Sequence, residues 1–411
     1  MDAPLTKAQT PPLARTAPLA VVPLAVAFAA WGLSNMDQSL FGYAVPALMR
    51  DLHLSLDGVS LIISGSFACS IVVSVLIGVL TDKWGARITL PLCLGLSAML
   101  VGLQGMAPTA LSFAVLRVAG YGFSGALSPI TNAMTAAAAP PRLRALAVAV
   151  LQCAYPLGWF VASLIVAPML VRTGWRETFM VGFVVAPLAV LCLFALPRRV
   201  PARLEGAAAP APLRALFSPE HRTVTVLMGL AFLLYGGSVG GTTFYLPTFF
   251  HVVRGYSEAV SARIVGLSYA IGSVGYIGAA VVSERWLSRR ATVVLWLVLG
   301  AAGLLAMIWA PRTVAQDIAM FGLTTLFFYG SSAILVIYLL ELFPERLRTT
   351  AAAVSGTACI SAGFVIFPIL TAQAVKAVGW SWSFTAVIVP ALLLAAALVL
   401  GLPQRVAWPT E

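Results

Sequence analysis

Long apolar runs separated by short polar loops extend along most of the chain. Each run is close to or above the length of about 20 residues that an α-helix needs to cross a bilayer. The pattern therefore predicts an all-α polytopic membrane protein with twelve transmembrane helices. The runs lie near 18–48, 57–81, 88–106, 109–138, 145–171, 177–196, 223–250, 258–282, 292–310, 314–340, 350–375 and 381–402.

The longest polar stretch, rich in Pro, Ala and Arg, separates the sixth run from the seventh. It divides the chain into two sets of six runs. We therefore expect an N-terminal six-helix bundle over 1–197, a cytoplasmic linker over 198–222 and a C-terminal six-helix bundle over 223–411.

The composition agrees with a membrane protein. The chain has 411 residues, of which 60% are hydrophobic and only 9% charged, whereas soluble domains carry about 25% charged residues. The net charge of +11 does not indicate a nucleic-acid partner, because the basic residues lie in short loops between apolar runs. The expected surroundings are the lipid bilayer. The 5 cysteines are scattered through apolar runs, without the spacing of a disulfide framework or a metal site.

Lysine and arginine positions predict the orientation, since cytoplasmic loops carry an excess of both. With the N-terminus inside, 17 of the 25 basic residues fall on the cytoplasmic side, 7 fall outside, and Arg117 lies within a run. Met1–Thr16 lacks the features of a cleaved signal peptide. We expect a multi-pass protein of a bacterial-type inner membrane with both termini in the cytoplasm.

Asp37 is the candidate proton-coupling residue. Of the 14 acidic residues, it alone lies well within a run, roughly 16 Å from the end of that run. A carboxylate at such depth is costly and usually functional. Burial favours its neutral form and a nearby cation its charged form, so the group can load and release a proton. The alternative is an acid paired permanently with Arg117 for stability.

Arg117 lies about 12 Å from the outer end of its span, at a depth that Asp37 can share. Two buried charges need partners. Arg117 can hold Asp37, the anionic group of a substrate, or each in turn; a fixed ion pair is the alternative.

Polar and aromatic side chains recur on single faces of several predicted helices. Tyr hydroxyls at membrane depth need partners, which a polar cavity provides. Helix–helix hydrogen bonds are the alternative for each residue alone. With Arg117, the candidate substrate-binding residues are Tyr121, Asn132, Gln152, Tyr155, Trp159, Tyr235, Ser238, Thr242, Tyr269 and Tyr276.

The sequence contains no phosphate loop, zinc ligand pair or catalytic triad. That argues against a membrane enzyme or a primary pump, and we expect no cofactor.

One loop carries a family resemblance. Gly78–Arg87 reads GVLTDKWGAR and resembles the loop between helices 2 and 3 of the major facilitator superfamily. Ala86 departs from it, since the family usually has a base there. The resemblance implies a gate on the cytoplasmic side, with Gly78 allowing close helix contact. The implied gating residues are Gly78, Asp82, Lys83, Gly85 and Arg87, together with Glu284 and Arg285 in the second-half echo VSERWLSRR.

LRVAGYGFSGA around Arg117 resembles the helix-4 pattern of that family, an Arg followed by a Gly-rich stretch. GWR at 174–176 resembles the helix 5–6 loop of its sialate, lactate and aromatic-acid symporters, and LELFPERLRTTA at 340–351 resembles the helix 10–11 loop of its proton-coupled organic-acid and sugar members. Aromatic-acid members usually carry two acids in helix 1, whereas this chain has only Asp37. The resemblance implies two pseudo-symmetric halves with a site between them near the midplane.

The resulting interpretation is a monomeric secondary transporter that imports a small organic anion, a mono- or aromatic carboxylate, with the proton gradient as energy source. A drug/proton exporter of the same fold is one alternative, although Tyr155-Pro156-Leu157-Gly158 only partly matches the Gly-Pro pattern of such proteins. A membrane sensor that binds a ligand without moving it is another.

Overall fold

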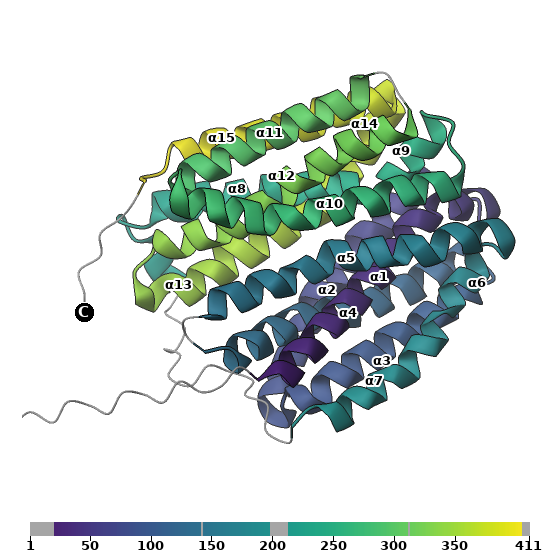
Figure 1. The fold of residues 1–411 in the computed structure, drawn as a ribbon, viewed down its shortest axis with the longest axis horizontal. Helices are drawn as coiled ribbons and strands as arrows, with labels where there is room; N and C mark the ends of the chain where they lie inside the picture. Colours follow the sequence, from purple (N-terminus) through teal and green to yellow (C-terminus); the bar gives the residue numbers. More distant parts are fainter. Residues whose placement is uncertain (1–19, 141–142, 198–212, 311–312, 405–411) are drawn as a thin grey trace, which may run out of the picture.

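A computed structural model describes residues 20–140, 143–197, 213–310 and 313–404, and these residues form helices and no strand. The all-α prediction is confirmed. Two groups of helices lie one above the other in Figure 1. The N-terminal half comprises α1 (Val21–Asp51), α2 (Leu56–Trp84), α3 (Ala86–Gly105), α4 (Ala110–Ala138), α5 (Arg144–Arg172), α6 (Trp175–Met180) and α7 (Gly182–Ala195).

The C-terminal half follows a short 3₁₀ helix, η2 (Leu213–Phe217). Its last helices are joined by two π-helical turns: η3 (Ala352–Ala358) leads into α14, and η4 (Phe384–Ile388) joins α14 to α15. The half comprises α8 (Arg222–Thr243), α9 (Leu246–Val252), α10 (Glu258–Arg285), α11 (Arg289–Trp309), α12 (Val314–Glu341), α13 (Glu345–Ala351), α14 (Cys359–Ser383) and α15 (Val389–Leu400).

Capping side chains fix where several helices begin. The side chain of Ser55 accepts the backbone N–H of Gly58 at the start of α2, and Thr109 caps α4 in the same way through Ser112. Such caps satisfy N–H groups that a helix leaves unpaired. The helix α2 ends at Gly85, whose φ of 79° favours glycine. This backbone conformation therefore explains why the second glycine of the GVLTDKWGAR loop, Gly85, is needed there.

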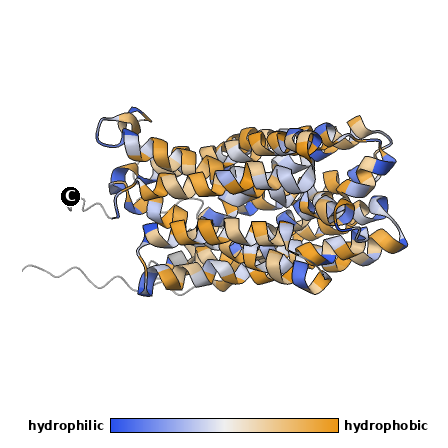
Figure 2. Ribbon diagram, turned by 90° about the horizontal axis from the view of Figure 1, so that it is seen from above, coloured by the Kyte–Doolittle hydropathy of each residue, from blue (hydrophilic) through white to orange (hydrophobic). Residues whose placement is uncertain are grey.

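Ten helical stretches of the described residues are long and apolar enough to cross a membrane. The last runs over Glu345–Leu400, 56 residues, and contains a break at Gly379, whose φ is 79°. Hydrophilic residues gather at the two ends of the bundle, and hydrophobic ones cover its middle (Figure 2). This distribution is the one that a bilayer requires.

Part of the expected organisation falls on residues outside the described ranges. Of the expected linker, residues 198–212 lie there, and α8 begins at Arg222. The same holds for some of the basic residues that predicted the orientation, namely Lys7, Arg15, Arg142, Arg198, Arg199, Arg203, Arg312 and Arg405.

The two ends of the bundle differ in how the halves meet. We call the end where α1 begins and α15 ends the terminal side, at the left of Figure 1, and the opposite end the far side. Across the halves, α2 packs against α14 and α5 against α10. The far-side part of α2 is buried at Val59 and Ile62, whereas Val72 and Val79 nearer the terminal side are 61% and 52% exposed. The contacts of α2 with α14 run from Asp57 through Ser64 to Phe67, so the C-terminal half covers the far-side part of α2.

Among the described residues, two ion pairs join the halves on the far side. Arg50 Nη1 lies 2.8 Å from Glu258 Oε1, and Lys376 Nζ lies 2.7 Å from Asp57 Oδ2. Gln373 also donates to Asp57, at 3.1 Å. We call Arg50, Asp57, Glu258 and Lys376 the far-side clamp. It stabilises the conformation described here, in which the far side is closed.

Removing the clamp should favour the conformation that is open on the far side. Exposed pairs contribute roughly 0.2–1 kcal/mol each, so the double variant Asp57→Asn/Glu258→Gln should shift the equilibrium about 2- to 30-fold. Electron–electron distances between spin labels at positions 111 and 378, in a background without other cysteines, measure the shift. Glu177→Gln removes a far-side acid that has no ion pair across the halves among the described residues and is the control. An unchanged distance distribution in the double variant would mean that apolar packing alone closes this side.

Candidate functional site

Asp37 and Arg117 meet inside the N-terminal half. Arg117 Nη1 lies 3.0 Å from Asp37 Oδ1, so α1 and α4 are joined by a salt bridge. The side chain of Asp37 is 9% exposed and that of Arg117 is 2% exposed. The other carboxylate oxygen, Oδ2, accepts a hydrogen bond of 3.2 Å from Ser97 Oγ on α3. Losing one partner of a buried pair is strongly destabilising, so each charge holds the other in place.

The ion pair with Asp37 leaves some N–H donors of the Arg117 guanidinium without a partner. It lies over the rings of Phe41 and Tyr121, with centroid distances of 4.9 Å and 5.3 Å. Its Nε is buried and has no hydrogen-bond partner among the described residues. A guanidinium offers five N–H donors. Arg117 therefore retains donor capacity for a second anion.

Arg117 also borders a narrow gap between the halves, which in this conformation is too small to hold even one water molecule. Phe244, in the turn between α8 and α9, meets Phe41 and Phe67 there, at centroid distances of 6.4 Å and 6.0 Å. These rings lie between the pair and the far side, so the gap is closed from that direction. Its lining residues are Phe41, Ile63, Ser66, Phe67, Arg117, Tyr121 and Phe244.

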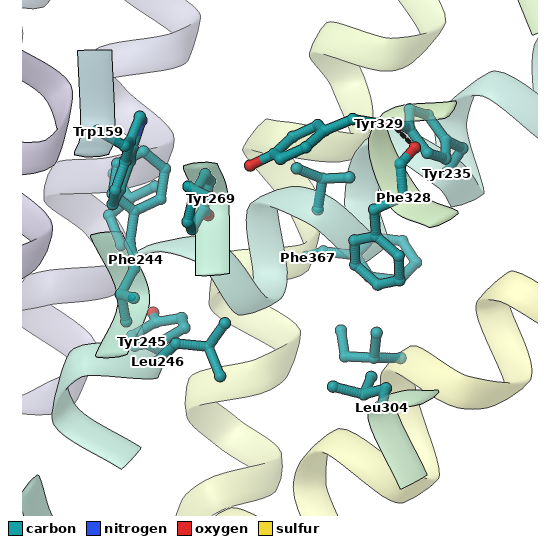
Figure 3. Packing of buried hydrophobic residues seen from close by; sticks show 14 of the residues in the cluster. Trp159, Tyr235, Phe244, Tyr245, Leu246, Tyr269, Leu304, Phe328, Tyr329 and Phe367 are labelled. Atoms are coloured by element: carbon teal, nitrogen blue, oxygen red, sulfur yellow. Dashed lines mark hydrogen bonds between the residues drawn. The ribbon is translucent and has the colours of Figure 1, made fainter. Parts of the chain in front are cut away.

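An aromatic cluster spans the two halves next to this gap (Figure 3). Trp159 of α5 stacks on Tyr269 of α10, with centroids 5.0 Å apart and planes 8° from parallel. Tyr155 meets Tyr329 of α12 edge to face at 5.6 Å, and Tyr329 stacks on Tyr276 at 5.7 Å. Figure 3 shows the Tyr329 hydroxyl pointing toward Tyr269. In this conformation the rings pack against one another between the halves, with Trp159 and Tyr269 fully buried.

Two polar groups beside this cluster have no partner among the described residues. They are the buried Nε1 of Trp159 and the buried Oε1 of Gln152. Both belong to α5 and share its face with Tyr155. Buried polar groups usually find a hydrogen-bond partner, so a polar molecule between the halves would satisfy a donor and an acceptor at this place.

Other candidate binding residues bond within the protein. The side chains of Ser238, Thr242 and Asn132 donate to backbone carbonyls of their own helices. The hydroxyl of Tyr235 donates to the carbonyl of Phe328, 2.8 Å away, and that of Tyr269 to Thr243 Oγ1 at 3.1 Å. In this conformation the first three side chains therefore bond within their own helices, and Tyr235 contacts the backbone next to Tyr329. Their part in binding stays a prediction.

The predicted gating residues lie on the terminal side, and their hydrogen bonds and ion pairs described here stay within one half. Arg87 donates to the carbonyl of Leu193 at 2.9 Å, and Glu284 lies 3.8 Å from Arg289. Asp82 and Lys83 are exposed at the end of α2. Arg285 borders a surface cavity of about 1080 Å³ with Glu284.

The expected close helix contact at Gly78 is not present in this conformation. The residue is exposed, and a Cβ built on it would meet no atom within 4 Å. The reason is that the C-terminal half leaves the terminal-side part of α2 uncovered. A latch between the two loops stays a prediction for the opposite conformation.

The sequence did not identify Ser97, Phe41, Phe244 or Tyr329 as site residues. Tyr329, like Tyr269, is a tyrosine within an apolar run, so the same pattern indicates it as a candidate. A single serine such as Ser97 has no distinguishing signal, because serines are common in these helices. The phenylalanines gain their role only from contacts between helices far apart in the chain.

The sequence matches a family model and proteins of known function. A family model described as Major Facilitator Superfamily matches residues 27–359. The cis,cis-muconate transport protein of Acinetobacter baylyi is 25% identical over 341 residues, which cover 79% of this chain and 80% of that protein. The gentisate transporter of Corynebacterium glutamicum is 26% identical over 329 residues, covering 77% and 72%.

Among solved structures, a bacterial homologue of the human lysosomal transporter Spinster matches with a TM-score of 0.70. The match covers 93% of this chain and 95% of that chain at 15% identity. At this identity the likeness concerns the fold alone.

Proposed function

The chain belongs to the Major Facilitator Superfamily, a family of membrane transporters and not of enzymes, and we propose that it imports a small organic anion together with protons. The observation that carries this proposal is the buried pair of Asp37 and Arg117, because it combines an acid that can bind a proton with a base that can bind an anion. The relatives named for muconate and gentisate support a carboxylate as the cargo. The ring surface of Trp159 and Tyr269 suits a planar, aromatic one.

The proposed cycle uses competition for Arg117. When Asp37 is charged it holds the guanidinium, and when it binds a proton the pair weakens and Arg117 can turn to a carboxylate in the gap. Inward movement of an anion is opposed by about 2.3 kcal/mol per charge per 100 mV. One proton per negative charge cancels this term, and a second would drive accumulation. The proton gradient is then the energy source, and no cofactor is needed.

We propose twelve spans for the chain in the bilayer. To the ten apolar stretches we add α1, which at 31 residues is long enough to cross, and we divide Glu345–Leu400 at Gly379. The far side is then the outer face of a bacterial-type inner membrane, and both termini are cytoplasmic. The halves are 1–197 and 223–411, joined by a linker over 198–222, and one chain contains the whole path, so a monomer suffices.

The test is uptake into proteoliposomes that contain the purified full chain. An inward proton gradient should drive accumulation of gentisate or cis,cis-muconate above the outside concentration, with alkalinisation of the outer medium. D-xylose, which carries no charge, is the control. Accumulation that is indifferent to the gradient would contradict proton coupling. Proton-driven extrusion of a cationic dye such as ethidium, with no carboxylate uptake, would favour the drug exporter.

A further inference from the structure

The acid and the base of the buried pair face two different spaces. Arg117 borders the narrow gap between the halves, and Asp37 is not among the residues that line it. Asp37 instead borders a second cavity, within the N-terminal half, and Arg117 is not among its lining residues. The carboxylate therefore turns one oxygen to Arg117 and the other, Oδ2, to the opposite side.

The second cavity lies between α1, α3 and the junction of α6 with α7. It has a volume of about 30 Å³, and a cavity needs only about 10–15 Å³ to hold a water molecule. A buried water also needs at least two polar partners. Those on its wall are the Asp37 carboxylate and the Ser97 hydroxyl. Ser34 also lines it, but its hydroxyl bonds to Ser124 of α4, 2.7 Å away. Its other lining residues are apolar.

The rim of this cavity lies where α6 ends at Met180 and α7 begins at Gly182. Val181 and Val185 at this junction are half-buried, whereas the deeper wall residues Ala98 and Val101 are 6% and 2% exposed. Of the charged and titratable groups, Arg117 and Tyr121 of α4 face Asp37. The lining residues from α3, from α7 and from the α6–α7 junction include no titratable side chain. The face of α1 that meets α5 is a different one, with Asn35 against Gly158.

We propose that this cavity binds one water molecule that delivers the proton to Asp37 Oδ2, so that proton and substrate reach the pair by separate routes. The inference rests on the proposed function, since it assigns a route to its proton. The water accepts a proton that enters at the rim between α6 and α7 and passes one to Oδ2, with no net chemical change to itself. Neutral Asp37 then releases Arg117 to the gap. The ion pair is the element that couples the two routes.

Infrared spectroscopy of the purified full chain in bilayers tests this route without a known substrate. The C=O band of protonated Asp37 is identified by its loss in Asp37→Asn, and its shift after a change to heavy water reports proton exchange. Ala98→Leu fills the cavity and should slow exchange by about a hundredfold, because proton transfer needs a partner in direct reach or one water away. Val185→Leu narrows the cavity from the opposite wall and should slow exchange if the first variant folds poorly.

Two controls separate the routes. Leu96→Phe enlarges a residue of α3 that is 39% exposed and points away from the cavity, and Ser66→Val enlarges one that lines the gap at Arg117. Both should exchange as fast as the unmodified chain. Unaltered exchange in Ala98→Leu and Val185→Leu, or slowed exchange in Ser66→Val, would overturn the separate route and leave proton coupling intact. The absence of an Asp37 band at every pH would instead overturn the proposed function.

Discussion

Asp37→Asn should abolish proton-driven accumulation while substrate exchange across the membrane continues. The amide has nearly the shape of a protonated carboxyl and cannot lose a proton, so the variant resembles the protein with the proton always bound. Ser97 can still bond to the amide oxygen, and Arg117 is free to bind an anion. In proteoliposomes, the concentration ratio driven by a pH gradient should fall to that of passive equilibration, with counterflow retained.

Asp317→Asn is the matched control for this variant. Asp317 is 2% exposed, lies 3.5 Å from Arg254 Nε and accepts a bond of 2.8 Å from the Tyr256 hydroxyl. It is thus a second buried acid paired with an arginine, but on the far side of the C-terminal half. Its loss should lower thermal stability and leave the dependence on the pH gradient unchanged. Full accumulation by Asp37→Asn, or equal loss in both variants, would remove Asp37 from the coupling mechanism.

The sequence predicted the helices well because each span must satisfy its backbone within the bilayer. Apolar runs report that constraint directly, and the expected runs coincide with helices along the described chain. The ends were less certain, since caps such as Ser55 and breaks such as Gly379 depend on single residues. The π-helical turns near Ala352 and Phe384 have no signal in the apolar pattern.

Charged site residues can be predicted from the sequence because charges are rare within the spans. Hydroxyl-bearing site residues can be predicted only in part. Asp37 and Arg117 stood out because an ionised group in a bilayer needs a partner, and the structure brings them within 3.0 Å. Hydroxyls such as Ser238 gave no such certainty, because a serine in a helix can bond to its own backbone, as it does here. The state of the gate depends on how the halves pack, which no local pattern encodes. Gly78 is exposed for this reason.

Arg117→Ala should weaken carboxylate binding more than any change in the aromatic cluster. Hydrogen bonds to charged groups contribute about 1.5–3 kcal/mol, which corresponds to roughly a 10- to 150-fold loss of affinity. Tyr235→Phe, which removes only the hydroxyl bonded to Phe328, should cost less affinity and is the comparison. Isothermal titration of the purified variants with gentisate or cis,cis-muconate gives both values.

The single variant also leaves Asp37 buried without its cation, which costs about 3–5 kcal/mol while the acid stays charged. A fall in folded yield would then be confused with a loss of binding. The double variant Asp37→Asn/Arg117→Ala removes that charge, so thermal stability should recover while affinity does not. Arg117→Lys keeps the charge but not the planar fork that reaches Asp37 and the gap at once, and should show intermediate affinity. If the double variant is stable and binds the anion as tightly as the unmodified chain, Arg117 has only a structural role, and the carboxylate must be held by another group between the halves.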